Sequence, residues 1–331
     1  LFYIKEVREC KNNTFFRRYN KQVYMLCNIY TCSFYKSNIC QKRHQILSIA
    51  RKRKITEKKR TFASQLNYRT MAGIYIHIPF CKTRCIYCDF YSTTRSELKS
   101  RYIHALCKEL QMRKEYLRGE PVETVYFGGG TPSILEQRVL TGILQAMRDH
   151  FAIDPAAEIT VECNPSKDLT RDMEQYAAAG INRVSIGMQS AVDRERFALG
   201  RRAGSVEVAR TVAAAKAAGI TNISLDVMLG TPKQTPDSLE ETFAFIARMQ
   251  VTHISAYLLK IEPGTPFDRL QAKLALPEED TVCQMYLQTV ERLGQLGFAQ
   301  YEISNFARPE HRGRHNLLYW DCQDYLGIGP A

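Results

Sequence analysis

The chain has 331 residues and carries 46 Lys and Arg against 34 Asp and Glu, a formal net charge of +12. The excess lies entirely in residues 1–70, with 17 basic and 3 acidic residues, whereas residues 71–331 hold 29 and 31, a net charge of −2. The body of the protein therefore lacks the basic surface that a nucleic-acid partner requires. No stretch approaches the roughly 20 apolar residues of a membrane-spanning helix, so a transmembrane protein is not expected.

Residues 1–70 differ from the rest of the chain in composition as well as in charge. They are rich in Lys, Asn, Tyr, Phe, Ile and Cys, start with Leu1 rather than Met, and show neither a helical period nor strand alternation. We interpret them as upstream DNA translated in frame, with Met71 as the true start. A targeting segment is the alternative, because the stretch is basic and poor in acids. Cysteines outside the motif described below are scattered, which favours a reducing, cytoplasmic location.

From Gly73 onward the sequence alternates short β-branched runs with amphipathic helical patterns. The pattern predicts strands over 74–78, 124–127, 158–162, 183–186, 222–227 and 253–258. Helices are expected from about Leu98 to before Gly119, from Ser133, from Ser205 as N-cap to Gly219, and from Asp237. Six βα units in series specify an α/β fold with a parallel sheet and right-handed crossovers. The expected organisation is an extension over 1–70, a barrel-like domain over 71–297 and the start of a further region over 298–331.

Three cysteines, Cys81, Cys85 and Cys88, form a C-x3-C-x2-C run directly after the first predicted strand. A [4Fe–4S] cluster has four irons that each take a terminal ligand, so three thiolates leave one iron open for a small molecule. A zinc knuckle is the alternative, but closed zinc sites need four ligands, and no second C-x2-C occurs in the chain. The spacing therefore favours an iron–sulfur cluster with an open coordination position.

Polar or glycine-rich residues follow each of the next strands, where the chemistry of α/β barrels gathers. Gly128-Gly-Gly-Thr-Pro132 allows a ligand close to the backbone, and Glu162, Gln189, Arg201 and Asp226 come at or after later strand ends. Each of these polar residues alone is more often solvated or helix-capping than a ligand. Their succession on consecutive strand ends instead indicates one shared site.

The cysteine run and these strand-end motifs resemble the radical S-adenosylmethionine (SAM) family over residues 73–331. The resemblance implies a partial (β/α)6 barrel, a [4Fe–4S] cluster on the three cysteines and SAM on the open iron. It places the SAM contacts on Tyr75, Tyr87, Gly129, Gly130, Thr131, Glu162, Gln189, Arg201 and Asp226. Ala203 and Thr231 depart from residues that the family often has at those positions, without touching the expected contacts.

Two features bear on the branch of the family. Phe90 stands where the oxygen-independent coproporphyrinogen III oxidases carry a fourth cysteine, so the chain is more similar to the heme chaperones, the HemW group. His315-Asn-Leu-Leu-Tyr-Trp320 matches an HNxxYW motif associated there with heme, which implies heme contacts at His315, Asn316, Tyr319 and Trp320. Histidine is a common axial ligand of heme iron, and aromatic rings can stack on a porphyrin. In isolation, the hexapeptide is better explained by a His and a Trp packed in a loop.

The resemblance therefore implies a heme chaperone that passes heme to an acceptor protein and needs a reductant for its cluster. The alternative is a coproporphyrinogen III oxidase of porphyrin biosynthesis.

The composition boundary at Met71 gives the first prediction. A chain beginning at Met71 should express, fold and bind iron as well as the full chain, because residues 1–70 carry no core pattern. Circular dichroism and iron content compare the two directly. Loss of the fold or of the iron on deletion would show that the segment is structural.

Overall fold

The computed structural model describes residues 72–166 and 169–330. The expectations for residues 1–70 and for Met71 as the start lie outside this part of the chain. The strands are β1 (Ala72–Ile78), β2 (Val122–Gly129), β3 (Ile153–Cys163), β4 (Arg183–Gln189), β5 (Asn222–Leu229), β6 (His253–Leu258), β7 (Ala299–Gln300), β8 (Asn305–Ala307) and β9 (Tyr325–Ile328). The α-helices are α5 (Lys99–Met112), α6 (Gln137–His150), α7 (Leu169–Ala178), α8 (Asp193–Ala198), α9 (Ser205–Ala217), α10 (Pro236–Met249), α11 (Pro266–Leu270), α12 (Glu279–Gln295) and α13 (Arg314–Trp320). Short 3₁₀ turns are η3 (Ser96–Leu98), η4 (Pro132–Ile134) and η5 (Gln271–Lys273).

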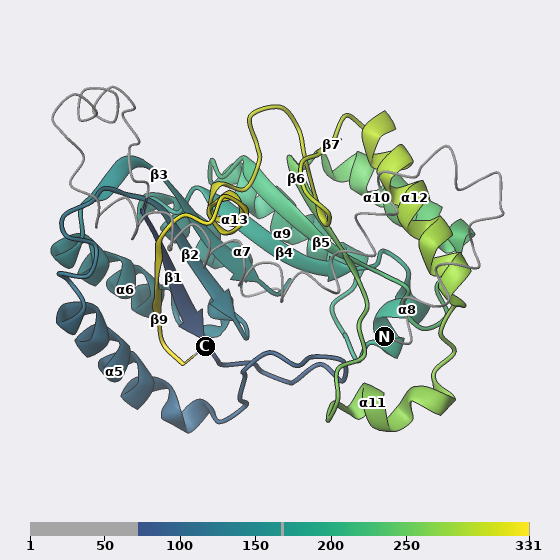
Figure 1. Cartoon of the computed structure of the whole chain (residues 1–331), viewed down its shortest axis with the longest axis horizontal. Coiled ribbons are helices and arrows are strands. Elements are labelled where there is room, and N and C mark those ends of the chain that lie inside the picture. Colours follow the sequence, from purple (N-terminus) through teal and green to yellow (C-terminus); the bar gives the residue numbers. More distant parts are fainter. Residues whose placement is uncertain (1–71, 167–168, 331) are drawn as a thin grey trace, which may run out of the picture. The chain divides into compact units, whose positions relative to one another are not determined.

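The strands form one nine-stranded sheet in the order β7-β8-β6-β5-β4-β3-β2-β1-β9. Strands β1 to β6 are parallel neighbours, which confirms the six predicted strands and the α/β partial barrel. All carboxyl ends of these strands lie at one edge of the sheet, the lower edge in Figure 1. No helix within 72–166 and 169–330 is long and apolar enough to cross a lipid bilayer.

Strand β1 shows how the two faces of the sheet differ. Ile74, Ile76 and Ile78 are fully buried, and each such side chain contributes about 1.5–3 kcal/mol relative to exposure. Tyr75 and His77 alternate with them and therefore point to the opposite face, because successive strand side chains change sides. The inner face is thus polar, and its groups must find partners within the protein.

The first residues of α6 and α9 differ from those expected from the sequence. The helix expected from Ser133 begins only at Gln137, because Pro132–Ile134 form a 3₁₀ turn and Leu135 is extended. Ser205 is the first helical residue of α9 rather than its N-cap, which is Gly204. Gly219 follows the end of α9 with a φ of +86°, a left-handed conformation that glycine adopts without steric cost.

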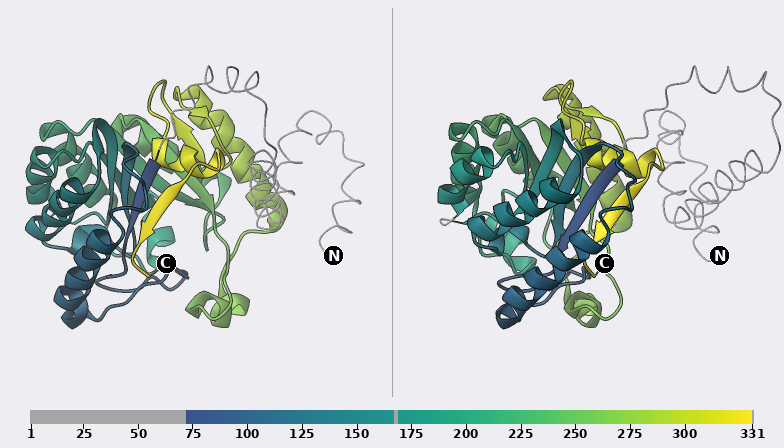
Figure 2. Two further views of the ribbon diagram at one scale, coloured as in Figure 1. Left: turned by 60° about the vertical axis from the view of Figure 1, so that its left-hand side comes forward. Right: turned by 90° about the vertical axis from the view of Figure 1, so that its left-hand side faces the viewer.

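Residues after 297 join the same sheet. β8 pairs antiparallel with β6, and β9 pairs parallel with β1, alongside which it runs in both views of Figure 2. Between them, α13 packs against β2. The Glu158 carboxylate of β3 accepts hydrogen bonds from the backbone N–H groups of Arg314 and His315, each at 3.1 Å. It thereby satisfies two donors that the first turn of a helix leaves open.

This cap predicts a stability effect. Glu158→Ala should lower the free energy of unfolding by about 1–3 kcal/mol, because the buried N–H of His315 and the partly buried N–H of Arg314 lose their acceptor. Urea unfolding measures the change. Glu136→Ala, which removes an exposed ion pair with Arg138, is the matched control and should cost under about 1 kcal/mol. Equal effects of the two substitutions would contradict the role of Glu158.

Candidate functional site

A loop of residues 81–92, here called the cysteine loop, follows β1 at the carboxyl edge of the sheet. Its base is closed by a bridge between Phe80 and Thr93, with Cys81 N–H donating to the Thr93 carbonyl at 2.9 Å. The Thr93 N–H returns a hydrogen bond of 2.7 Å to the Pro79 carbonyl. The loop is therefore anchored at both ends to the end of β1.

The three cysteines of this loop are partly exposed. Cys88 N–H donates to the Cys85 carbonyl at 3.2 Å. Burial raises the pKa of the Cys88 thiol, and Cys85 and Cys81 raise it further, so the three thiols lie within electrostatic reach of one another. Among residues 72–166 and 169–330, no three His, Cys, Asp or Glu side chains converge closely enough for a single metal ion. A four-iron cube differs in that each thiolate meets a separate iron.

The glycine loop after β2 lies directly against the cysteine loop. Thr131 Oγ1 donates to Cys81 Sγ at 3.5 Å, and Thr131 N–H donates to the Phe80 carbonyl at 2.9 Å. A Cβ on Gly130 would lie 2.8 Å from the Phe80 carbonyl oxygen, so only glycine permits this approach. Gly129 has a φ of +115° and donates its N–H to Glu162 Oε2 at 3.2 Å.

Tyr87 and Arg201, far apart in sequence, meet beside the cysteines. The Nε and Nη2 groups of Arg201 each donate to the Tyr87 hydroxyl at 3.3 Å. Nη1 donates to the Gly187 carbonyl at 3.1 Å and to Asn164 Oδ1 at 2.9 Å. This guanidinium thus joins the cysteine loop to the ends of β3 and β4.

Glu162 lies at the end of β3 on the inner face. Its Oε1 accepts from the Tyr126 hydroxyl at 2.9 Å. Burial and, after it, the nearby Asp226 raise its pKa to about 7, although the hydrogen bonds from Tyr126 and Gly129 oppose the rise. This pKa places the titration of the Glu162 carboxyl close to neutral pH.

Asp226 and Gln189 lie on the neighbouring strands. Asp226 Oδ1 accepts from Ser185 Oγ at 2.9 Å, and burial raises the pKa of this carboxyl to about 6. Gln189 is buried and has a φ of +67°, rare for a residue with a side chain and found at functional sites. A Cβ on Gly187 would lie 3.3 Å from Gln189 Nε2 and 3.1 Å from Arg201 Nη1, so both side chains converge on this glycine.

The HNxxYW segment forms α13, on the inner face nearer the amino ends of the strands. His315 is only 2% exposed, and Tyr75 stacks above it with ring centroids 6.4 Å apart. Its Nδ1 lies 2.7 Å from Thr124 Oγ1 and its Nε2 lies 2.9 Å from the Tyr319 hydroxyl. Both ring nitrogens are occupied, so in this structure His315 offers none to heme iron. Trp320, at the end of α13, is 37% exposed.

Sequence reasoning assigned no role to Asn164 or His77. Asn164 Nδ2 donates to Thr131 Oγ1 at 3.0 Å, so the residue bridges the glycine loop and Arg201. His77 Nε2 lies 2.9 Å from the Tyr91 carbonyl, which only a protonated nitrogen can approach this way. In the neutral imidazole, Nδ1 is then the acceptor for the Tyr75 hydroxyl, which lies 3.2 Å away. Both residues lie within motifs visible in the sequence, but only the fold reveals their partners.

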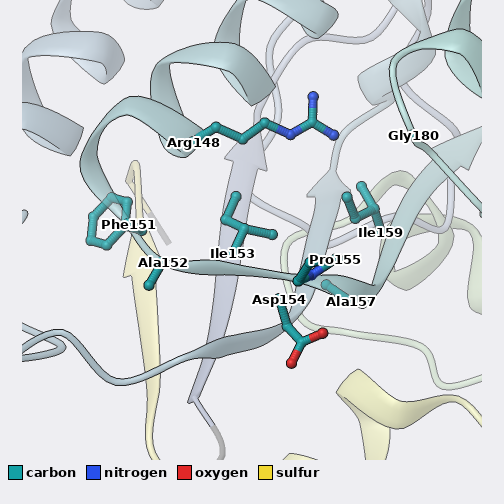
Figure 3. A pocket seen from close by; sticks show the side chains of 9 residues that line it. All are labelled: Arg148, Phe151, Ala152, Ile153, Asp154, Pro155, Ala157, Ile159 and Gly180. Atoms are coloured by element: carbon teal, nitrogen blue, oxygen red, sulfur yellow. The ribbon is translucent and has the colours of Figure 1, made fainter.

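A surface pocket elsewhere takes no part in this site. It lies around the amino-terminal part of β3 and is lined by Arg148, Phe151, Asp154 and their neighbours (Figure 3). The Arg148 guanidinium is held by the Ala179 carbonyl at 2.7 Å. The pocket lies at the strand end opposite the cysteine loop.

Residues 75–246 match the Radical SAM superfamily. The chain is 40% identical over 265 residues to the heme chaperone HemW of Mycobacterium tuberculosis, covering 78% of this chain and 68% of that protein. It is 36% identical over 262 residues to HemW of Escherichia coli, with the same coverage. Among solved structures, coproporphyrinogen III oxidase (HemN) from Escherichia coli superposes with a TM-score of 0.70 at 24% identity, covering 81% of this chain and 66% of that one. This last similarity is one of fold.

The chain therefore belongs to the radical SAM superfamily and, within it, to the family of the HemW heme chaperones. A [4Fe–4S] cluster and SAM follow from that membership.

The raised pKa of Glu162 predicts a pH effect on stability. Between about 4.5, the ordinary pKa, and about 7 the folded protein keeps a proton that the unfolded chain releases. The stabilisation of the folded protein by this proton is fully present below the ordinary pKa and is lost as the pH rises through 7. The loss is about 1.4 kcal/mol for each pH unit between the two pKa values. Glu162→Gln should therefore gain stability relative to the wild type as the pH rises from 5 to 8.

The difference between the two proteins is the informative quantity. His253 and His315, whose pKa values burial lowers, act in the opposite direction below pH 6.5 in both proteins. Urea unfolding across this pH range gives the difference. A difference that is independent of pH would contradict the raised pKa.

Proposed function

We propose that this chain is the radical SAM part of a heme chaperone, which binds heme and transfers it to an acceptor protein. The observation that carries the proposal is the contact of the cysteine loop, through Cys81 and Tyr87, with Thr131 and Arg201 at the carboxyl ends of the strands. Similarity to HemW heme chaperones supports the choice of function.

The cluster is assigned to Cys81, Cys85 and Cys88, whose loop follows β1 at the carboxyl edge of the sheet. When bound there, such a cluster supplies an electron to SAM. The partial exposure of the three thiols leaves room for iron. Thr131 Oγ1 is already within hydrogen-bond distance of one sulfur, and hydrogen bonds to sulfur tune cluster potentials.

SAM is assigned to the inner-face groups that surround this mouth. Glu162 and Asp226 provide two carboxylates whose pKa values are raised by burial away from solvent. A positively charged ligand, such as an ammonium and a sulfonium group, would favour their ionised forms. The glycine loop offers backbone groups, and Gln189, Arg201, Tyr75 and Tyr87 offer polar or aromatic contacts to the remainder of the molecule.

Heme is assigned to the α13 segment. Trp320 is exposed at the end of the helix, and Tyr319 contacts the half-exposed Tyr325 of β9 with ring centroids 4.9 Å apart. These rings can stack on a porphyrin. Asn316 lies on the same helix, and His315 lies beneath it, within the barrel.

The oxidase alternative rests on fold similarity alone. Phe90 is 67% exposed at the place where the oxidases carry an additional cysteine. The phenyl ring of Phe90 has no donor atom that could ligate iron, which favours the chaperone. We further propose a cytoplasmic location and a one-electron reductant as partner, since the thiolates of a cluster require reducing conditions.

The cluster assignment predicts the outcome of cysteine substitutions. Anaerobic reconstitution of the full chain should give a brown protein with about four irons. Cys81→Ala, Cys85→Ala or Cys88→Ala should abolish the colour, whereas Cys283→Ala, at an exposed cysteine on α12, should retain it. Iron analysis and visible absorption measure this, and full iron in Cys85→Ala would exclude the assignment.

The choice of function predicts two further results. Heme added to the reconstituted protein should bind stoichiometrically with a Soret band, and Trp320→Ala should weaken binding about fivefold or more, by loss of stacking. Coproporphyrinogen III with SAM and reductant should yield no protoporphyrinogen IX. Turnover of that substrate without heme binding would favour the oxidase.

A further inference from the structure

His315 is held from three directions on the inner face of the barrel. Thr124 Oγ1 and the Tyr319 hydroxyl occupy its two nitrogens, and its backbone N–H donates to Glu158. A neutral imidazole has one donor and one acceptor nitrogen, and each hydroxyl can serve in either role, so the ring is fully satisfied. Burial lowers the pKa of His315 to about 3, consistent with a neutral ring throughout the physiological range.

The His315 ring stacks on two tyrosines, of which Tyr75 is assigned to SAM. Tyr126 stacks on it with centroids 5.2 Å apart and planes inclined by 24°, and Tyr75 does so at 6.4 Å and 27°. Tyr75 and Tyr126 are direct cross-strand partners on β1 and β2 and stack on each other at 6.0 Å. The Tyr126 hydroxyl in turn donates to Glu162. One continuous chain of contacts therefore runs from α13 to the SAM residues Tyr75 and Glu162.

We propose that His315 is a positioning residue for SAM. From α13, its ring fixes the position of Tyr75 by stacking, and it fixes the position of Glu162 through Tyr126. The inference rests on the SAM contacts assigned above to Tyr75 and Glu162. The HNxxYW motif then serves two functions, the positioning of SAM contacts by His315 and the stacking on heme by Trp320. His315 and Tyr319, four residues apart, share one helix face and contact each other, whereas Trp320 is exposed at the end of the helix.

Heme and SAM binding are then coupled through α13, which carries the heme segment and contacts Tyr75. A ligand that displaces α13 must disturb Tyr75 and Glu162, and by linkage SAM must alter heme affinity by the same factor. Helix α13 packs closely against Gly73 of β1. A Cβ at Gly73 would lie 2.5 Å from Leu318 Cδ1 and 2.9 Å from Thr124 Oγ1. Gly73→Ala therefore forces the Leu318 and Thr124 side chains beside His315 to move without removing a functional side chain.

The test measures SAM affinity by calorimetry on the anaerobically reconstituted full chain, without reductant so that SAM stays intact. His315→Gln should weaken SAM binding about five- to tenfold, and Tyr319→Phe and Gly73→Ala about threefold, as expected for one lost or strained buried contact. The heme Soret maximum of His315→Gln should stay at the wild-type position. His104→Gln, at an exposed position on α5, is the matched control and should leave SAM affinity unchanged.

A purely structural histidine would lower the melting temperature and leave SAM affinity unchanged, which would overturn the proposal. A shifted Soret maximum with unchanged SAM affinity would also overturn it, by making His315 an axial ligand. If His315→Gln fails to fold, Tyr319→Phe, which keeps the ring packing, takes its place. Unchanged SAM affinity in Tyr319→Phe would then overturn the proposal. Absence of heme binding in the wild type would contradict the proposed function but not the SAM result, so the two failures remain distinct.

Discussion

The structure depends on satisfying polar groups on the inner face of an incompletely closed parallel sheet. The outer face of β1 is apolar and fully buried, as in other α/β proteins. The inner face carries carboxylates, hydroxyls, imidazoles and guanidinium groups, which are costly to bury without partners. The protein meets this constraint in two layers. Arg201, Asn164 and Thr131 connect the loops at the carboxyl ends, and α13 with Glu158 supplies partners nearer the amino ends.

The two layers differ in how completely they are satisfied. His315 and His253 have partners on both ring nitrogens. Glu162 and Asp226 accept hydrogen bonds but have raised pKa values, because burial opposes their charge. In the layer at the amino ends both histidines are paired, although Thr160 Oγ1 and Arg183 Nε are buried without a hydrogen-bond partner. The layer at the carboxyl ends retains an electrostatic demand for a cation, because burial opposes the charge of its two carboxylates. Such unsatisfied demand is typical of a ligand site.

The sequence was sufficient for most of the fold. Six strands follow from β-branched runs, and all six form. The strands β7, β8 and β9 have only two to four residues and leave no periodic signal, so their place in the sheet could not be predicted. Likewise, Pro132 and an extended Leu135 delay α6 beyond Ser133.

For the site, the motifs identify residues but not their partners. The resemblance assigns Tyr87 and Arg201 to one ligand, but their mutual contact and the bridging role of Asn164 require the fold. His315 illustrates the limit most clearly. A histidine beside aromatics suggests a heme ligand in sequence, whereas its burial between Thr124 and Tyr319 is a tertiary fact that no local pattern encodes.

The central claim is that the cysteine loop and the carboxylates of the inner face form one site, with SAM bound to an open iron of the cluster. The most direct measurement is electron–nuclear double resonance on the reduced cluster, using SAM labelled with ¹⁵N at its amino group and ¹⁷O at its carboxylate. The account predicts hyperfine coupling of both labels to the cluster in the wild type. A cluster that forms but shows no coupling to either label in the presence of saturating SAM would contradict it.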